Sequence, residues 1–176
     1  MQETILYIAV SIDGYIATES GTIDWLDLTR VPLVSSSQYT QFYDTVGAVV
    51  MGNKTYKQIT TELAVDNYPY NDVQSYIFTH QPSTNTDSIT FLNEPVDVAL
   101  PKIREATVGN IWIVGGNSVI QPLIEKNLID TYIITVIPVF LGKGIRLFET
   151  FDSDQYEFIM KSTTLENGMV TYTFKK

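Results

Sequence analysis

Short runs of apolar residues, separated by glycine, proline and polar turns, divide the chain into segments of strand and helix length. Near-continuous apolar runs bounded by turn residues are typical of buried strands, and apolar positions three or four residues apart indicate helices. These signals predict strands at 4–11, 46–51, 74–79, 88–92, 111–114, 130–137, 156–163 and 169–174. They predict helices at 35–44, from 53 to about 60, from 95 to about 106, and from 117 or 118 onward.

The order of these segments predicts the fold class. Strands alternate with helices through most of the chain, as in α/β proteins with a mostly parallel sheet. The last two strands are joined by Glu166-Asn167-Gly168, a strong hairpin signal, which adds antiparallel strands at one edge. Pro101 and Pro122 fall inside expected helices and predict a kink or a later start. No segment resembles a linker, so we expect residues 1–176 to form a single domain.

Composition narrows the class of protein. Hydrophobic residues make up 44% of the 176 residues and charged residues 18%, which is typical of a folded globular domain. The apolar runs are too short to cross a bilayer, and the N-terminus lacks the basic and apolar regions of a secretory signal. We therefore expect a cytoplasmic protein. The absence of cysteine excludes disulfides and thiol catalysis, and no metal site is expected.

The charge of the chain limits its partners. A net charge of −9, from 20 acidic and 11 basic residues, repels phosphate backbones and anionic membrane surfaces, so neither nucleic acid nor a membrane is expected as a partner. A small anionic ligand is compatible with this charge. Local N–H groups and one or two cations can outweigh a diffuse charge that salt screens within about 10 Å. The few basic residues near glycine turns are therefore informative.

Two strand-to-helix junctions carry the glycines that a phosphate site needs. In Ile111-Trp-Ile-Val-Gly-Gly-Asn-Ser-Val-Ile120 an apolar strand runs into two glycines and then into a helix that Asn117 or Ser118 can cap. Val46–Met51 runs in the same way into Gly52-Asn53-Lys54-Thr55. Glycine lets the backbone approach a ligand, and the first N–H groups of a helix attract an anion. One such junction also serves as an ordinary tight turn, but two at the carboxyl ends of parallel strands favour a nucleotide or dinucleotide site.

Several motifs occur in a characteristic order along nearly the whole chain. They are Ala9-Val-Ser-Ile-Asp-Gly-Tyr-Ile16, Trp25, Val50-Met-Gly-Asn-Lys-Thr-Tyr56, Phe78-Thr-His-Gln-Pro82, Val114-Gly-Gly-Asn117, Ile137-Pro-Val-Phe-Leu-Gly-Lys-Gly144 and Leu147-Phe148. This order resembles the dihydrofolate reductase superfamily, and most closely the C-terminal reductase domain of the bacterial bifunctional deaminase-reductase of riboflavin biosynthesis. The resemblance implies a dihydrofolate reductase-like three-layer α/β/α sandwich, NADPH as the hydride donor and a homodimer. It also implies a cis peptide between Gly115 and Gly116.

By this resemblance, NADPH would be held by groups from four regions of the chain. They are Ala9 and Ile16 beside the nicotinamide, Gly52, Asn53, Lys54 and Thr55 at the pyrophosphate, Phe78, Thr79 and His80 near the adenosine 2′-phosphate, and Val114, Gly115, Gly116, Asn117, Ser118 and Val119 as a second phosphate wall. Asn53 and His80 stand where many relatives carry arginine or another basic residue. The preference between NADPH and NADH is therefore left open. His80 is equally well explained as a surface loop residue.

The position of the acid distinguishes the branches of the superfamily. Dihydrofolate reductases present a carboxylate on the first helix to bind and help protonate the pterin, and that place falls near Ser36. Residues 35–43 contain no Asp or Glu, so dihydrofolate is not expected as the main substrate. Thr135 matches the threonine that normally meets this carboxylate and is a candidate catalytic residue. Ser36 and Trp25 are candidates for the substrate side, and Asp13 is either a turn residue or a catalytic proton relay.

The leading hypothesis is an NADPH-dependent reductase that passes a hydride to a C=O or C=N group of a small heterocyclic or sugar-like substrate. The resemblance names 5-amino-6-(5-phosphoribosylamino)uracil reductase as the nearest known activity. Lys143 and Arg146 are candidate cations for a sugar phosphate, although a solvated loop explains them as well. The alternatives are a divergent dihydrofolate reductase that takes its carboxylate from Asp24 or Glu19, and a non-catalytic NADP(H)-binding protein.

Overall fold

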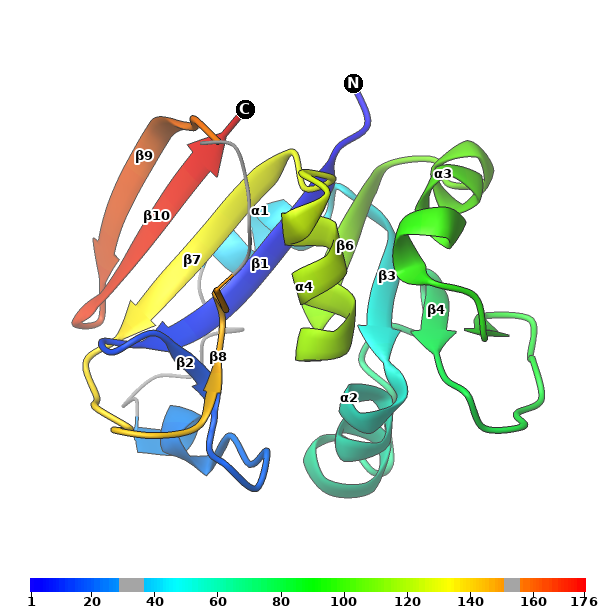
Figure 1. Cartoon of the computed structure of the whole chain (residues 1–176), viewed down its shortest axis with the longest axis horizontal. Coiled ribbons are helices and arrows are strands. Elements are labelled where there is room, and N and C mark those ends of the chain that lie inside the picture. Colours follow the sequence, from blue (N-terminus) through cyan, green and yellow to red (C-terminus); the bar gives the residue numbers. More distant parts are fainter. Residues whose placement is uncertain (29–36, 151–155) are drawn as a thin grey trace.

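A central eight-stranded sheet organises the computed structural model, which describes residues 1–28, 37–150 and 156–176. The strand order is β5-β4-β3-β6-β1-β7-β10-β9, and the first six strands are mutually parallel whereas β10 and β9 are antiparallel (Figure 1). The strands of this sheet are β1 (Thr4–Ser11), β3 (Val46–Gly52), β4 (Gln74–Phe78), β5 (Ile89–Leu92), β6 (Asn110–Gly115), β7 (Thr131–Ile137), β9 (Ile159–Glu166) and β10 (Met169–Lys175). The predicted mostly parallel α/β sheet with a C-terminal hairpin is confirmed.

The first strand of that hairpin lies three residues later than the sequence pattern predicts. Asn167 and Gly168 both take positive φ, 53° and 79°, and form a two-residue turn that pairs Glu166 with Met169. Because the turn sets the register, the strand must continue up to Glu166. β9 therefore runs over Ile159–Glu166 and not over 156–163.

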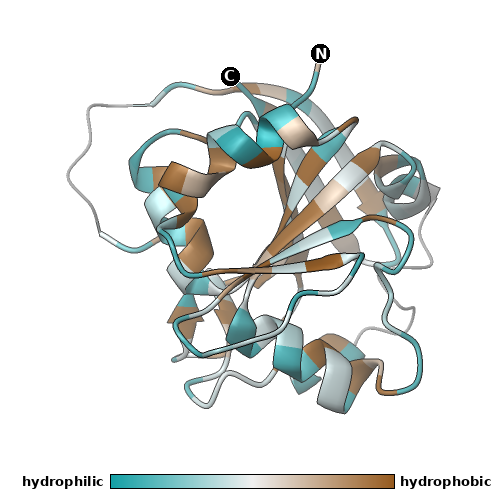
Figure 2. Ribbon diagram, turned by 90° about the vertical axis from the view of Figure 1, so that its right-hand side faces the viewer, coloured by the Kyte–Doolittle hydropathy of each residue, from teal (hydrophilic) through white to brown (hydrophobic). Residues whose placement is uncertain are grey.

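Helices cover both faces of the sheet, so the molecule has three layers (Figures 1 and 2). On one face lie α3 (Val96–Ala106) and α4 (Asn117–Glu125), and on the other lie α1 (Ser37–Tyr43), α2 (Asn53–Gln58) and the π-helical turn η3 (Ile59–Leu63). Of the two alternatives predicted for the internal prolines, a kink or a later start, the later start is wrong, since α3 and α4 run through Pro101 and Pro122. Each proline removes one N–H donor, and the buried faces of both helices compensate by packing on the sheet.

The alternation of side chains along the strands divides the core in two. Leu6 of β1 and Ile113 of β6 pack in the cluster under α3 and α4, whereas Tyr7 and Trp112 belong to the cluster under α1 and η3. Figure 2 shows the apolar colour concentrated on the strands between the helix layers. The two faces therefore differ in character, because the α1 side is rich in aromatic rings.

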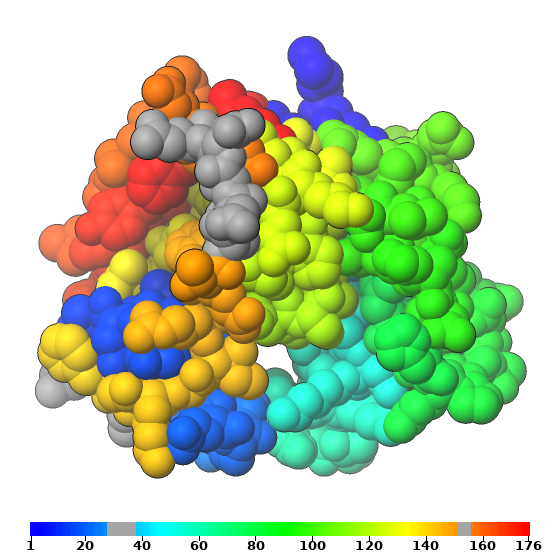
Figure 3. All heavy atoms as spheres, in the orientation of Figure 1, coloured from blue at the N-terminus to red at the C-terminus, as the bar shows by residue number. Residues whose placement is uncertain are grey.

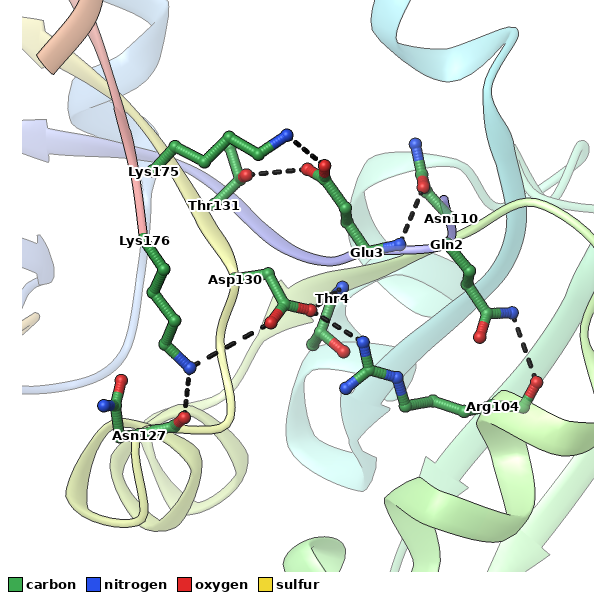
Figure 4. Close-up of polar contacts among 10 residues, drawn as sticks. All are labelled: Gln2, Glu3, Thr4, Arg104, Asn110, Asn127, Asp130, Thr131, Lys175 and Lys176. Atoms are coloured by element: carbon green, nitrogen blue, oxygen red, sulfur yellow. Dashed lines mark hydrogen bonds and ion pairs between the residues drawn. The ribbon is translucent and has the colours of Figure 1, made fainter. Parts of the chain in front are cut away.

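The amino ends of the central strands are tied together by a polar network (Figure 4). Asp130 Oδ2 accepts hydrogen bonds from the backbone N–H of Thr4 at 2.8 Å and from Arg104 Nη2 at 2.8 Å. Glu3 accepts from Thr131 Oγ1 at 2.8 Å and pairs with Lys175. This network lies at the end of the sheet opposite to the carboxyl ends of the parallel strands, so it supports the fold and leaves the other end free for a ligand.

Three short elements lack a sequence signal and were not predicted. β2 (Tyr15–Ala17) pairs antiparallel with β8 (Ile145–Arg146) in a separate two-stranded sheet, and a 3₁₀ turn, η1, spans Asp24–Leu28. All three lie near the carboxyl end of β1 (Figure 1). No helix within the described ranges is long and apolar enough to cross a membrane.

Candidate cofactor and substrate cavity

A cavity of about 490 Å³ opens at the carboxyl ends of β1 and β6. Figure 3 shows a hollow at this level between an N-terminal segment, in blue, and the region of α2, in cyan. This volume lies in the range of small-molecule sites, and the carboxyl ends of parallel strands are where such sites form in α/β sheets. The cavity is therefore the leading candidate for the functional site.

The two glycine junctions converge on this cavity because β3 and β6 are neighbouring parallel strands. A Cβ added to Gly116 would lie 3.2 Å from Thr55 Oγ1 and 3.5 Å from Gly52 Cα. A Cβ added to Gly52 would lie 3.4 Å from Ser118 Oγ. The first turns of α2 and α4 therefore lie side by side. The two glycines have no side chains that would keep the backbones of these turns apart.

Two details of the junction at Gly115 and Gly116 differ from the sequence-based predictions. The Gly115–Gly116 peptide is trans, so the predicted cis bond is wrong. Positive φ angles of 152° and 84° at the two glycines make the turn without it. Neither Asn117 nor Ser118 caps α4, since the N-cap is Gly116 and no side chain bonds there. The amide of Asn117 donates instead to Glu149, which turns the side chain away from the capping position.

Ten of the residues named from sequence line the cavity. They are Ala9, Ile16, Lys54, Thr55, Val114, Gly115, Gly116, Asn117, Ser118 and Thr135. Gly52 and Val119 lie behind this surface, packed against each other across the two junctions, and Asn53 is also outside the lining. Phe78, Thr79 and His80 lie at the end of β4, which is separated from β6 by β3. There the Thr79 hydroxyl accepts from the Gln81 N–H at 3.0 Å, and His80 Nδ1 lies 2.6 Å from Asn93 Oδ1.

Lys54 is the one cation among the described residues that line the cavity. Its Nζ donates to the carbonyl of Ser20 at 3.4 Å and lies over Gly21, where a Cβ would come within 2.5 Å of it. The helix α2 thus brings a positive charge to the junction of the two glycine turns. That is the chemistry expected of a phosphate contact.

Asp13 does not line the cavity. Its carboxylate instead accepts hydrogen bonds from the loop that follows β7. It accepts hydrogen bonds from Ser11 Oγ at 2.6 Å, from the N–H of Gly142 at 2.7 Å and from that of Leu141 at 3.2 Å. The Ser11 hydroxyl, with help from the two backbone donors, holds the pKa of Asp13 below its ordinary value. This geometry favours the turn interpretation over the proton relay.

Thr135 faces the cavity, and its partner is another threonine. Its Oγ1 lies 2.9 Å from Thr171 Oγ1, in a buried pair. No carboxylate occurs among the described lining residues. Glu19 is engaged with Lys143 at 2.8 Å, and neither Glu19 nor Asp24 lines the cavity. The pterin-binding arrangement of a dihydrofolate reductase is therefore missing from the described site.

The remaining candidates lie outside the cavity. Trp25 packs with Ile137 and Met169 in a separate small cluster, although its neighbour Leu26 does reach the lining. Arg146 stacks over the ring of Tyr15 at 4.8 Å and donates to its hydroxyl at 3.1 Å. Ser36 falls outside the residues that the structure describes. Across the described chain, no three His, Asp or Glu side chains gather as a metal site requires.

The aromatic wall of the cavity was missed by sequence reasoning. It consists of Tyr7, Tyr39, Tyr70 and Trp112, which come from β1, α1, the segment before β4, and β6. Their ring centroids are 6.1 Å apart for Tyr7 and Tyr39, 6.0 Å for Tyr39 and Trp112, and 5.3 Å for Tyr70 and Trp112. Burial raises the pKa of Tyr39 and, more strongly, that of Tyr70, so both hydroxyls stay protonated at neutral pH. The one sequence signal was the number of tyrosines, 11 in all.

The sheet order and the helix layers define a dihydrofolate reductase-like α/β protein, with a cavity at the two glycine junctions. A comparison with protein families sharpens this class. The model of the RibD C-terminal domain matches residues 3–171, and the chain belongs to this family.

Known proteins agree with this assignment. The chain is 40% identical over 154 residues to the uncharacterized protein YwjB of Bacillus subtilis, covering 87% of this chain and 86% of that one. The crystal structure of a putative riboflavin biosynthesis protein from Shewanella sp. PV-4 is similar with a TM-score of 0.82 at 24% identity, over 99% and 98% of the two chains. A dihydrofolate reductase from Enterococcus faecalis complexed with NADP(H) has a TM-score of 0.67 at 16% identity, over 99% and 97%. These two structures share the fold of this chain.

Proposed function

We propose that the protein is an NADPH-dependent reductase that transfers a hydride to a C=O or C=N group of a small heterocyclic substrate. One observation carries the proposal. Two glycine turns and Lys54 meet at one end of a cavity, and the same cavity continues past them into an aromatic, largely apolar space. Such a site suits a charged dinucleotide at one end and a ring substrate at the other.

The residues present fit this cofactor. Gly52 and Gly116 let the two turns approach each other closely, since a Cβ at either position would meet the opposite turn, and Asn117 Oδ1 is buried without a partner in the described chain. Lys54 and Thr55 would bind the phosphates, and Ala9 and Ile16 would flank the nicotinamide. NADPH supplies the hydride when bound. The protein's own share is to orient the ring, exclude water and keep tyrosine hydroxyls within reach of the substrate.

Two alternatives are a divergent dihydrofolate reductase and a non-catalytic NADP(H)-binding protein, and the cavity favours neither. A divergent dihydrofolate reductase would need a carboxylate at the substrate, and Asp24 and Glu19, the two candidates, are not on the cavity surface. A non-catalytic NADP(H)-binding protein would hold the nicotinamide against a closed wall. Open space lined by Tyr7 and Trp112 beside the expected nicotinamide position favours catalysis instead.

A parallel titration with NADPH and NADH tests the proposal. We expect NADPH to quench the fluorescence of Trp112, which lines the cavity, with a dissociation constant in the micromolar range, and to be oxidised by at least one ring carbonyl. A small difference between NADPH and NADH is expected, because Asn53 and His80 replace the basic residues of many relatives. Failure of both cofactors to bind at millimolar concentration would refute the proposal.

We also infer that the protein acts in the cytoplasm as a homodimer. β9 is an edge strand of the sheet and exposes Ile159 at 60%, Met160 at 52% and Leu165 at 75%, an apolar surface that a second copy would cover. Size-exclusion chromatography with light scattering should give twice the mass of one chain. A monomer mass at micromolar and higher concentrations would contradict the dimer.

A further inference from the structure

The charge of the cavity defines the substrate class, given the proposed reductase function. Among its described lining residues there is no Asp or Glu, and the one cation, Lys54, lies at the start of α2 beside the glycine turns. The aromatic side chains of Tyr7, Tyr39, Tyr70 and Trp112 also line the cavity. A charged group moved from water to such a surface would lose its hydration and find no opposite charge, which costs several kcal/mol. The described part of the lining therefore disfavours both anionic and cationic substrates.

The two basic residues that would serve a phosphorylated sugar are engaged elsewhere. Lys143 forms an ion pair with Glu19 at 2.8 Å, and neither residue is on the cavity surface. Arg146 is held over the ring of Tyr15 and donates to its hydroxyl at 3.1 Å. Lys54 is the only basic residue of the described chain that lines the cavity, and the proposed cofactor phosphates would bind to it.

One hydroxyl in the aromatic wall has no hydrogen-bond partner among the described residues. It belongs to Tyr70, which is 8% exposed. Its neighbours in the same aromatic cluster behave differently, since Tyr43 donates to Asp72 at 2.6 Å and the hydroxyls of Tyr68 and Ser75 lie 3.0 Å apart. The Tyr70 oxygen is not among the fully buried unpaired atoms, and Tyr70 lines the cavity, so a ligand atom that enters the cavity can accept a hydrogen bond from it.

We propose that the substrate is an uncharged, planar, unphosphorylated ring carbonyl that stacks in this wall and accepts a hydrogen bond from Tyr70. A bound NADPH would supply the hydride, which would form a C–H bond at the carbonyl carbon as the C=O π bond breaks. A proton from water would complete the new hydroxyl, leaving hydroxide in solution and the cofactor as NADP⁺. Tyr70 binds the oxygen on which negative charge develops, and it keeps its own proton because burial raises its pKa.

Isatin and isatin-5-sulfonate provide a matched pair of probes, since they share one planar ring system and differ by one negative charge. With the NADPH-loaded protein we expect isatin to be reduced at C3, with a kcat/KM at least about tenfold above that of the sulfonate. Calorimetric binding of the two rings gives a second readout that does not need turnover. Equal or better use of the sulfonate, preferential use of the phosphoribosylaminouracil, or no binding of isatin at millimolar concentration would overturn the proposal.

The role of Tyr70 is tested by Tyr70→Phe beside Tyr43→Phe, a control that removes a hydroxyl of the same cluster from outside the cavity lining. We expect Tyr70→Phe to lower kcat/KM for isatin about tenfold to a hundredfold with unchanged NADPH affinity, as loss of a hydrogen bond to an oxygen that develops negative charge requires. Tyr43→Phe should leave both constants unchanged. An unaltered kcat/KM in Tyr70→Phe overturns this assignment. Failure of NADPH itself to bind would instead refute the reductase proposal, which the cofactor titration reveals separately.

Discussion

Gly116 and Thr55 belong to different helix-starting turns, yet a Cβ added to Gly116 would lie 3.2 Å from the Oγ1 of Thr55. The φ of Gly116 is +84°, a value that residues with a side chain rarely adopt. The two turns therefore pack closely at Gly116. A larger residue at this position would both clash with Thr55 and need an unfavourable backbone conformation. This contact joins the two halves of the proposed phosphate site.

Gly116→Ala is expected to weaken NADPH binding by at least about tenfold, because the new methyl group separates the turns that hold the phosphates. The dissociation constant should be measured on a variant whose circular dichroism matches the parent. Gly168→Ala is the control for backbone strain, since Gly168 has φ +79° in the β9–β10 turn and nothing within 4 Å of its added Cβ. Both variants should lose about 1–2 kcal/mol of stability. Equal affinity in the two variants would contradict the prediction.

Lys54→Met should reduce NADPH affinity about tenfold to a hundredfold, the range for losing a hydrogen bond to a charged group. The remaining affinity should also depend less on salt, because fewer ionic contacts are screened. Lys57→Met is the matched control, since Lys57 lies one turn later on α2, bonds to Gln81 at 3.1 Å and does not line the cavity. If Lys57→Met weakened binding as much, the effect would be one of overall charge and not of a specific contact.

Asp13→Asn should lower the melting temperature and leave kcat for isatin within about twofold. A proton relay needs a pKa near the working pH, whereas the bonds from Ser11 and the loop hold the pKa of Asp13 below its ordinary value. The amide replaces one acceptor oxygen by a donor, so the bonds to Gly142 and Leu141 cannot both persist. A fall in kcat of more than tenfold, with an altered pH profile, would restore the relay interpretation.

Asp130→Ala should destabilise the protein by about 1–3 kcal/mol without changing NADPH affinity. The substitution leaves the N–H of Thr4 and the guanidinium of Arg104 without their acceptor, and Thr4 is fully buried (Figure 4). Denaturant unfolding gives the stability, and a cofactor titration on the same sample gives the affinity. A large loss of NADPH binding in a folded variant would mean that the two ends of the sheet are coupled.

The fold was predictable because its strong signals are local. β1 spans Thr4–Ser11 as its apolar run predicts, and the Asn167-Gly168 turn marks the hairpin. The glycine junctions were also readable, since each is a contiguous motif. What the sequence could not supply is strand order: β3 and β6 become neighbours only through pairings between residues far apart in the chain.

The aromatic wall of the cavity also depends on pairings between distant parts of the chain, which the sequence does not reveal. Alternation along β1 and β6 places Tyr7 and Trp112 each on one face of its own strand, but only the register that pairs Ile5 with Trp112 brings those faces together. Tyr39 and Tyr70 then arrive from a helix and a loop with no periodic signal in common. The Gly115–Gly116 bond shows a different kind of error. The family resemblance predicted a cis peptide here, but the bond is trans and the two glycines make the turn with positive φ angles.

Asp97 and Lys126 link the first turn of α3 to the end of α4, and this pair should contribute an acid-sensitive part of the stability. The hydrogen bond from Lys126 holds the pKa of Asp97 below its ordinary value of 3.8. A lowered folded-state pKa means that the contribution is fully present above pH 3.8 and is lost as the pH falls through the folded-state value.

Because the Lys126 side chain is 59% exposed, screening limits the pair to about 0.5–1 kcal/mol. The melting temperature between pH 6 and pH 3 should therefore fall less steeply in Asp97→Asn than in the parent. Lys126→Met should flatten the curve in the same way, and the double variant should add nothing to either single one, since all three remove one interaction. Additive effects of the two substitutions would show that Asp97 and Lys126 stabilise the helices independently.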